Sequence, residues 1–311
     1  MAEGISRREF LRWSIGAGLF LGAGINLPQW PVDSLAGHSV PDLAVARGDI
    51  VNSTEAALAA LGGMGRFVKP GDKVVIKPNI SFANPPEKAT TTDPLLVKTL
   101  ARLCLQAGAE SVTVVDHTLH HWRICMKKTG IEAALSGVKG VSILPLNRRR
   151  LFEEVPIPKG KVLRKTELAR VLLGSDVLIS APVAKCHSAT RVSLNLKGLM
   201  GLVWDRNRMH QVDVEQAIAD LATAVKSHLV VIDASRALLT QGPGGPGKVT
   251  KLDTIVVGTD PVAADAYTVT LTPWYGKGFA PRQIRHLLLA HQMGLGRIEL
   301  DKVKIEKLTV R

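Results

Sequence analysis

Cysteine is scarce in this sequence and follows no recognisable pattern. Its 311 residues include three cysteines, Cys104, Cys125 and Cys186. An odd and widely spaced set of this kind does not indicate a disulfide framework, even in an oxidising compartment. Three cysteines are also too few for a self-contained four-cysteine iron–sulfur motif, so we expect no cluster held by this chain alone.

Aromatic residues are also sparse, at 4% of the chain. The 40 lysines and arginines outnumber the 27 aspartates and glutamates, which gives a formal net charge of +13, but they are spread along the sequence. Nucleic-acid-binding proteins usually combine clustered basic residues with a recognised motif or aromatic side chains, and neither is present. The charge therefore predicts an anionic small molecule or an acidic surface as the partner, and no nucleic acid.

Several catalytic motifs are missing as well. The sequence has no nucleophile elbow, no Walker loop, no H-E-x-x-H motif and no glycine-rich dinucleotide fingerprint at a strand-to-helix turn. These absences disfavour a serine hydrolase, a nucleoside triphosphatase and a nicotinamide-dependent dehydrogenase.

Long apolar runs are absent too, apart from one near the start that extends from about Trp13 to Leu27. This run has about 15 residues, whereas a transmembrane helix needs roughly 20. Adjacent arginines, Arg7 and Arg8, precede it in the order Ser-Arg-Arg-Glu-Phe-Leu. This order is typical of the twin-arginine (Tat) export signal.

We therefore predict a twin-arginine signal peptide over residues 1–36, with a cleavage site at Ser34-Leu35-Ala36. Its partner would be the Tat translocase, and its destination the periplasm or another extracytoplasmic space. An uncleaved anchor and an ordinary amphipathic N-terminus are the alternatives. Because the Tat route carries folded proteins, it favours a domain that gains a metal or cofactor before export. No later segment predicts a membrane span in the mature protein.

The rest of the chain alternates strand-like and helix-like segments. We predict a linker over 37–48 and a single α/β domain over 49–311, with three layers and a mostly parallel central sheet. The strands are expected at Lys73–Lys77, Ser111–Asp116, Val141–Leu146, Val177–Pro182, Leu229–Ala234 and Thr254–Thr259. The helices are expected at Ser53–Leu61, Pro94–Ala107, Lys127–Leu135, Lys165–Leu172, Val214–Ser227, Pro261–Thr270 and Pro281–His291.

Polar residues gather where the predicted strands end, which is where open α/β sheets bind ligands. The first strand runs into Lys77 and Asn79, a cation and an amide that suit an anionic ligand. A solvated loop is the alternative for both residues. Asp233 ends the fifth strand and is a further candidate ligand-binding residue.

A histidine-rich segment follows the second strand. Asp116, His117, His120, His121 and Cys125 lie within ten residues of one another. Imidazole, carboxylate and thiolate groups are metal ligands, so His117 and His120 are candidate ligands, together with His210 farther along the chain. Their spacing matches no specific zinc pattern, and each histidine could instead be a hydrogen-bonded surface residue.

The most distinctive cluster follows the fourth strand. Lys185 and His187 flank Cys186, and in an extended segment they share a face that Cys186 leaves. Asn195 and Lys197 follow in a glycine-containing turn or helix start that could hold an anion. We take Lys185, His187 and Lys197 as candidate catalytic residues and Asn195 as a ligand-binding one. A capped helix after a loop is the alternative.

These segments resemble a known family. VVIKPN, TTTDP, VLISAPVAKCHSATRVSLNLKGLMG, VVIDA, GPGG and VVGTDPVAADA occur in this order between about residues 72 and 266. Together they resemble domain-of-unknown-function family 362. Some members of that family carry a ferredoxin-like iron–sulfur domain, which implies redox or cofactor chemistry. Because this chain lacks the clustered cysteines, the resemblance implies a separate redox partner or another cofactor here.

We therefore expect an exported metal- or cofactor-dependent enzyme that acts on an anionic small molecule. A redox reaction is one option for its chemistry. A histidine can bind metal or transfer protons near neutral pH, so the histidines do not identify the chemistry. The alternatives are a non-catalytic protein that binds an anionic ligand and a cofactor-assembly protein for exported oxidoreductases.

Overall fold

The computed structural model describes residues 40–310, and the predicted signal peptide lies outside this range. The strands within it are β1 (Leu43–Arg47), β2 (Lys73–Pro78), β3 (Ser111–Asp116), β4 (Val141–Pro145), β5 (Phe152–Pro156), β6 (Lys165–Ala169), β7 (Val177–Ala181), β8 (Val183–His187), β9 (Arg191–Ser193), β10 (Leu229–Leu238), β11 (Val249–Gly258) and β12 (Ile305–Thr309).

The α-helices of the described residues are α2 (Ile50–Ala60), α3 (Pro94–Gln106), α4 (Trp122–Thr129), α5 (Ile131–Leu135), α6 (Arg170–Leu173), α7 (Asn195–Gly198), α8 (Arg206–Gln211), α9 (Val214–Ala224), α10 (Pro261–Val269) and α11 (Arg285–Gln292). Aspartate side chains begin several of them. Asp93 accepts a hydrogen bond from the backbone N–H of Leu95 at the start of α3, and Asp260 accepts two at the start of α10. Each precedes a proline whose fixed φ suits the first helical position.

Within residues 40–310, ten strands form one sheet whose main path is β12-β1-β11-β10-β7-β2-β3-β4. The neighbours from β10 to β4 run parallel, as do β1 and β12, whereas β11 runs antiparallel to both β1 and β10. Strand β8 pairs in parallel with β10 and antiparallel with β9. The sheet is therefore mostly parallel, as predicted.

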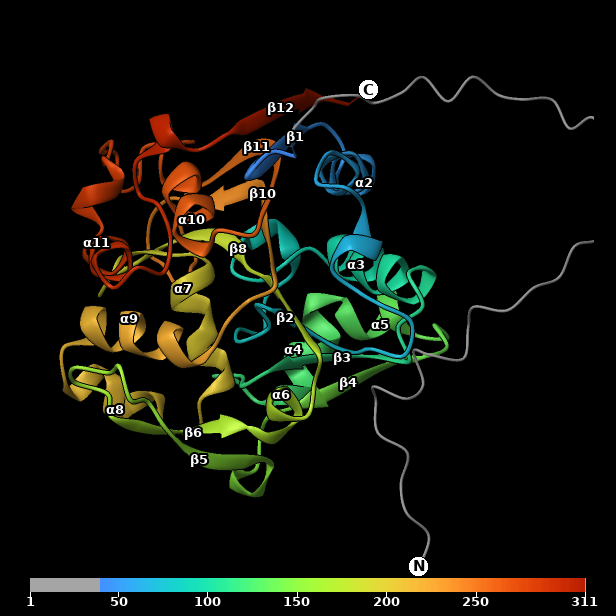
Figure 1. Cartoon of the computed structure of the whole chain (residues 1–311), viewed down its shortest axis with the longest axis horizontal. Helices are drawn as coiled ribbons and strands as arrows, with labels where there is room; N and C mark the ends of the chain where they lie inside the picture. The colour runs from blue at the N-terminus through green and yellow to red at the C-terminus, as the bar shows by residue number, and fades with distance from the viewer. Residues whose placement is uncertain (1–39, 311) are drawn as a thin grey trace, which may run out of the picture. The chain divides into compact units, whose positions relative to one another are not determined.

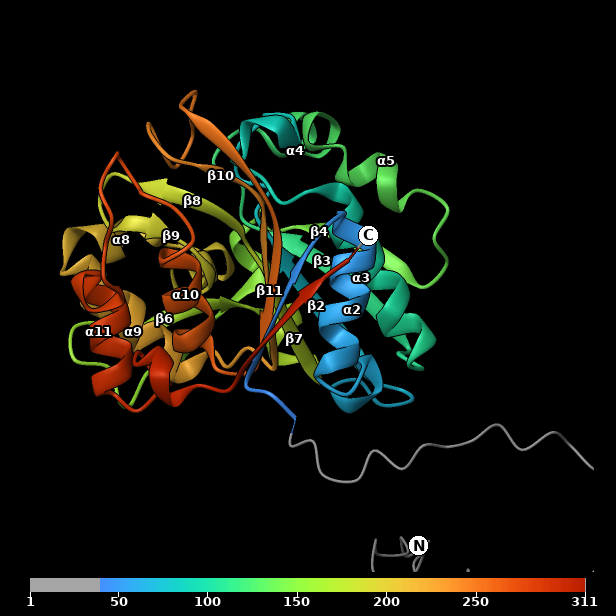
Figure 2. The same ribbon diagram turned by 90° about the horizontal axis from the view of Figure 1, so that it is seen from above.

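Helices cover both faces of this sheet. Figure 2 shows α2, α3 and α5 on one side of the strands and α9, α10 and α11 on the other, and Figure 1 shows the same elements from a second direction. Each face has its own apolar core: Ile76, Leu100 and Val114 belong to one, and Ile218, Ile232 and Leu287 to the other. Helices on both faces are what a parallel sheet requires, because its strands expose apolar side chains on each side. The α/β class with three layers is confirmed.

Three predicted segments have a different structure, and the strands β5, β8, β9 and β12 were not predicted. Residues 43–47 of the expected linker form β1, whose side chains are mostly buried between β11 and β12. Lys165–Ala169 of an expected helix forms β6, because it pairs antiparallel with β5 over five residues. The helix expected at Lys127–Leu135 is divided between α4 and α5 at Gly130, whose φ of 75° is left-handed.

The α-helices of residues 40–310 have at most 13 residues. None of them combines the length and the apolar character that a membrane crossing requires.

Candidate functional site

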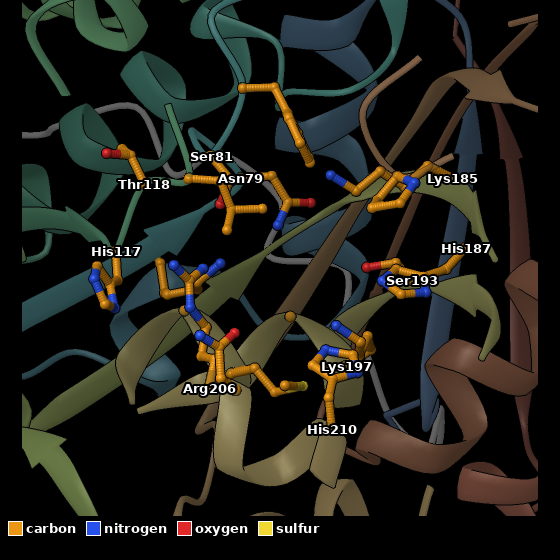
Figure 3. A pocket seen from close by; sticks show the side chains of 18 of the residues that line it. Asn79, Ser81, His117, Thr118, Lys185, His187, Ser193, Lys197, Arg206 and His210 are labelled. Atoms are coloured by element: carbon orange, nitrogen blue, oxygen red, sulfur yellow. The ribbon is translucent and has the colours of Figure 1, made fainter. Parts of the chain in front are cut away.

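A cavity of about 350 Å³ opens beside the carboxyl ends of β2 and β3, with β8, α7 and α8 forming its other walls. Seven of the ten candidate residues line it: Lys77, Asn79, His117, Lys185, His187, Lys197 and His210. Figure 3 shows these side chains, except that of Lys77, as labelled sticks around the cavity. Most of the candidate residues therefore lie around one cavity, although these seven are up to 133 positions apart in the chain.

Lys77 lines the cavity and is paired with Asp116, which is fully buried and does not itself line it. Lys77 ends β2 and Asp116 ends β3, and these parallel strands are neighbours in the sheet. The Lys77 Nζ lies 3.2 Å from Asp116 Oδ1, with the two side chains 2% and 0% exposed. It also donates a hydrogen bond to the carbonyl oxygen of Pro78. Burial lowers the pKa of Lys77, and the charge of Asp116 opposes this effect.

Lys185 is equally buried but has no such partner. It projects from β8 with 3% of its surface exposed, and among residues 40–310 no carboxylate lies within ion-pair distance of it. Its Nζ donates a hydrogen bond of 2.7 Å to the carbonyl oxygen of Thr90 and lies 5.3 Å from the ring centroid of Phe82. Burial, followed by the charge of Lys77, lowers the pKa of Lys185 to about 7.

Two more cations face the cavity from the helical side. Lys197 lies on α7, and burial and the charge of Arg206 lower its pKa to about 8. Arg206 begins α8, and burial lowers its pKa as well. Within the described range neither side chain forms an ion pair with a carboxylate. Four cations therefore share one pocket, whose lining also includes the exposed carboxylate of Asp205. We call this group (Lys77, Lys185, Lys197 and Arg206) the cationic cluster.

His187 and His210 stand next to this cluster. Their rings are nearly parallel, with centroids 6.4 Å apart. The Nδ1 of His187 accepts a hydrogen bond from the backbone N–H of Ala189, so the neutral ring carries its proton on Nε2. Burial and the charges of Lys197 and Lys185 lower the pKa of His187 to about 2. His187 is thus a neutral hydrogen-bond donor at physiological pH.

Three candidate residues lie outside the cavity wall, so their predicted ligand roles are corrected. Asn195 is fully buried, and its Oδ1 accepts a weak hydrogen bond of 3.4 Å from Ser227. Asp233 accepts hydrogen bonds from the backbone of Asp93 and from Ser235, which secures the start of α3. The Nδ1 of His120 accepts from the backbone N–H of Ala83. Asp233 and His120 therefore hold a helix start and a loop, whereas the Nδ2 of Asn195 is buried without a hydrogen-bond partner.

The predicted metal ligands His117, His120 and His210 do not come together. Among residues 40–310, no three histidine, cysteine, aspartate or glutamate side chains are grouped so that they could hold a metal ion. The His117 Nδ1 is hydrogen-bonded to the carbonyl oxygen of Val203, and its ring stacks on Trp204 at 5.2 Å. His117 and Trp204 instead form an aromatic wall of the pocket.

The family comparison bears on the segment that builds this pocket. A family model described as "Domain of unknown function (DUF362)" matches residues 74–270. The chain belongs to this family. The matched DUF362 segment begins in β2 and ends after α10, so it contains every residue of the cationic cluster and both stacked histidines. The resemblance expected from the motifs is therefore confirmed.

Further similarities were found among known proteins. A thylakoid-associated protein of Synechocystis sp. is 28% identical over 227 residues, which are 65% of this chain and 64% of that protein. The chain thus matches just under two thirds of that relative's length. Among solved structures, the lactate racemase apoprotein of Thermoanaerobacterium thermosaccharolyticum matches with a TM-score of 0.42 and 12% identity, over 67% of this chain and 54% of that one. A Thermotoga maritima protein matches with a TM-score of 0.39 and 13% identity, over 79% and 60%.

Sequence reasoning did not assign a role to three important residues of the DUF362 pocket. Arg206 and Ser193 line the cavity, and Asp116 holds Lys77. Asp116 could have been found, because it is an acidic residue at the end of an apolar strand next to the strand of Lys77. Ser193 had no sequence signal, since its position opposite Lys185 depends on the pairing of β8 with β9.

Proposed function

We propose that this protein binds a small anionic molecule in the pocket of the cationic cluster. The observation that carries the proposal is that Lys77, Lys185, Lys197 and Arg206 line one cavity whose lining includes a single carboxylate, the exposed Asp205, while the buried Asp116 is paired with Lys77. Like charges held together out of water raise the free energy of the unliganded pocket. An anion would relieve this repulsion, so the ligand itself is the missing counter-charge.

The donor set favours a carboxylate or phosphate group over a metal ion. Lysine and arginine side chains donate hydrogen bonds and accept none, so they suit oxyanions and repel cations. Arg206 adds a planar guanidinium that can bind two oxygens at once. An anionic substrate or an anionic organic cofactor fits this pocket, and the aromatic wall of His117 and Trp204 would contact its apolar part.

Binding can be tested with calorimetry and thermal melting in the presence of phosphate, pyrophosphate or glutarate. A ligand that binds the folded state raises the melting temperature in proportion to its concentration over Kd. We expect at least one dianion to do so, and no effect from an uncharged analogue such as glutaramide. Failure of all three anions at millimolar concentration would overturn the proposal.

Two arginines on the same helix give a matched pair of variants. Arg206 faces the pocket, whereas Arg208 is exposed on α8 and makes no ion pair within the described residues. We expect Arg206→Gln to weaken dianion binding about tenfold, since a charge-assisted hydrogen bond is worth roughly 1.5–3 kcal/mol. Arg208→Gln should change affinity less than about twofold, as exposed charges contribute little. Equal effects would place the anion elsewhere.

We further propose that the protein is exported through the Tat translocase to the periplasm. The support is the Arg7-Arg8 sequence and the short apolar run after it, which lie outside the described residues. Replacing Arg7 and Arg8 together by lysine should retain the protein in the cytoplasm, as measured by cell fractionation. Arg12→Lys in the same segment is the control, and unchanged export of the double variant would refute the route.

A further inference from the structure

Lys185 differs chemically from the other lysines of the cationic cluster. Lys77 is neutralised by Asp116, and Lys197 lies on a helix at the partly exposed side of the cavity. Lys185 is buried on a strand and its Nζ is held by a carbonyl oxygen and an aromatic ring, neither of which neutralises a charge. An amine in such surroundings is costly to protonate, so it loses its proton readily and becomes a nucleophile.

Every charged group that faces Lys185 acts on its proton. Lys77 on β2 and Lys197 on α7 favour the neutral amine, while Asp116 on β3 favours the charged one. Burial is the largest effect, and the outcome is a pKa of about 7. A large fraction of the Lys185 side chains is therefore neutral at pH 7, whereas the neutral fraction of an exposed lysine is roughly one in three thousand.

The pairing of β8 with β9 places two polar groups beside this amine. Ser193 is the direct cross-strand partner of Lys185, so their side chains lie on one face of the pair. His187 follows two residues after Lys185 on the same strand and shares that face. Both line the cavity (Figure 3), and His187 presents a neutral Nε2–H. These groups can donate hydrogen bonds to an oxygen bound next to Lys185.

We propose that Lys185 forms an imine with the carbonyl carbon of an anionic 2-oxo acid, an inference that rests on the anion-binding function proposed above. The neutral amine adds to the carbonyl carbon, and a C–N bond forms as the C–O π bond breaks. The two amine protons then leave with the carbonyl oxygen as water, which gives the C=N bond. No oxidant or reductant is required. Lys197 and Arg206 hold the carboxylate, and His187 and Ser193 stabilise the oxygen before it leaves.

Reductive trapping tests this inference on the full chain. Glyoxylate, pyruvate, oxaloacetate and 2-oxoglutarate would each be incubated with the protein and cyanoborohydride, which reduces the imine to a stable secondary amine. The modified peptide gains the mass of the acid minus one oxygen atom. We expect at least one acid to label Lys185 about tenfold faster than exposed lysines such as Lys251, because of its larger neutral fraction.

The variants and the pH profile separate a specific imine from general labelling. Lys185→Arg keeps the charge but cannot form an imine, so its label should disappear, whereas Lys251→Arg should leave labelling at Lys185 unchanged. At a saturating concentration of the acid, so that weaker binding at high pH does not limit the reaction, imine formation should rise with pH through about 7 and then level off, following the pKa of Lys185. The test does not require that Lys185→Arg folds, because peptide mapping of the labelled wild-type protein already shows which lysine reacts.

The same experiment distinguishes failure of this inference from failure of anion binding. Glutarate has the carboxylates of 2-oxoglutarate but no carbonyl, so it should bind and protect Lys185 without labelling it. If glutarate binds while Lys185 and Lys251 label at equal rates with all four acids, the imine is refuted and anion binding stands. If neither glutarate nor any of the acids shifts the melting temperature, both proposals fail.

Discussion

The Nζ of Lys77 lies 3.2 Å from the Oδ1 of Asp116, and this buried pair joins the ends of two neighbouring strands beneath the pocket. Asp116 also accepts hydrogen bonds at Oδ2 from the backbone N–H of Ile80 and from the hydroxyl of Ser81. One carboxylate therefore neutralises a cation and fixes the loop that follows β2. The shape of the pocket depends on the Lys77–Asp116 pair, because β2 and β3 both end beside the cavity.

Asp116→Asn should destabilise the fold strongly. It leaves the buried charge of Lys77 without its partner, and breaking such a pair costs about 3–5 kcal/mol. Urea denaturation monitored by circular dichroism would measure the loss. The double variant Lys77→Met/Asp116→Asn should recover much of it, because no unpaired charge then remains. A cost below about 1 kcal/mol for the single variant would mean that water reaches the pair.

Gly201→Ala should disturb the ion pair between Lys77 and Asp116, because Gly201 packs against both side chains. A Cβ at this position would overlap Asp116 Oδ1 and stand 2.9 Å from Lys77 Nζ. We expect a loss of about 1–3 kcal/mol in unfolding free energy and weaker binding of dianions. Gly198→Ala is the control in the same segment, because its Cβ would meet Pro182 at an ordinary 3.8 Å. Equal stabilities of the two variants would show that the backbone at 201 can move aside.

Asp265→Ala should loosen the helix that carries Lys197. The carboxylate of Asp265 is fully buried and accepts hydrogen bonds of 2.9 Å from the backbone N–H groups of Asn195 and Leu196 at the start of α7. Each buried donor left without an acceptor costs about 1–3 kcal/mol. Chemical denaturation should show this loss, and calorimetry should show weaker glutarate binding. Asp301→Ala, at an exposed position, should change stability by less than about 0.5 kcal/mol.

Dianion affinity should fall as pH rises from 6 to 9. Lys185 loses its proton near pH 7 and Lys197 near pH 8, so the pocket has its full positive charge only below this range. Calorimetry with glutarate at several pH values would follow the decline. In Lys185→Gln the part of the decline near pH 7 should be absent. An affinity independent of pH over this range would show that both lysines stay charged.

The unliganded protein should respond in the opposite direction, becoming more stable between pH 7 and pH 9. The folded-state pKa values of Lys185 and Lys197, about 7 and about 8, lie below the ordinary lysine value of 10.5. In this window the unfolded chain binds more protons than the folded one, so the unfolding free energy rises with pH. Urea titrations at pH 7, 8 and 9 would measure the rise, which should be smaller in Lys185→Gln.

Much of the fold could be predicted because its strands are short, apolar and bounded by turn residues. β3 was located at its exact ends, Ser111 and Asp116, and the aspartates before Pro94 and Pro261 marked the starts of α3 and α10. β6 was missed because its sequence, Lys-Thr-Glu-Leu-Ala, has helix-forming composition. Its pairing with β5 overrides that local preference, and no local pattern reveals such a pairing.

The candidate site could be predicted as far as local rules extend. Lys185 and His187 were placed on one face because an extended chain alternates its side chains, and β8 confirms this, with Cys186 contacting the backbone N–H of Gly242 away from the cavity. The histidines after β3 were misread as metal ligands. Their spacing along the chain does not predict that the ring of His117 is hydrogen-bonded to the carbonyl oxygen of Val203 and that of His120 to the backbone N–H of Ala83.

The sequence by itself determined the alternation of strands and helices, the excess of positive charge and the positions of lysines at strand ends, since each is a local or compositional property. Only the tertiary structure decided which of these lysines share a cavity and which has a counter-charge. Lys77 lies in β2 and Lys185 in β8, and Asp116 forms an ion pair with the first of these lysines and not with the second. The chemistry of an amine depends on the charges and solvent within a few ångströms of it, and residues distant in sequence supply these.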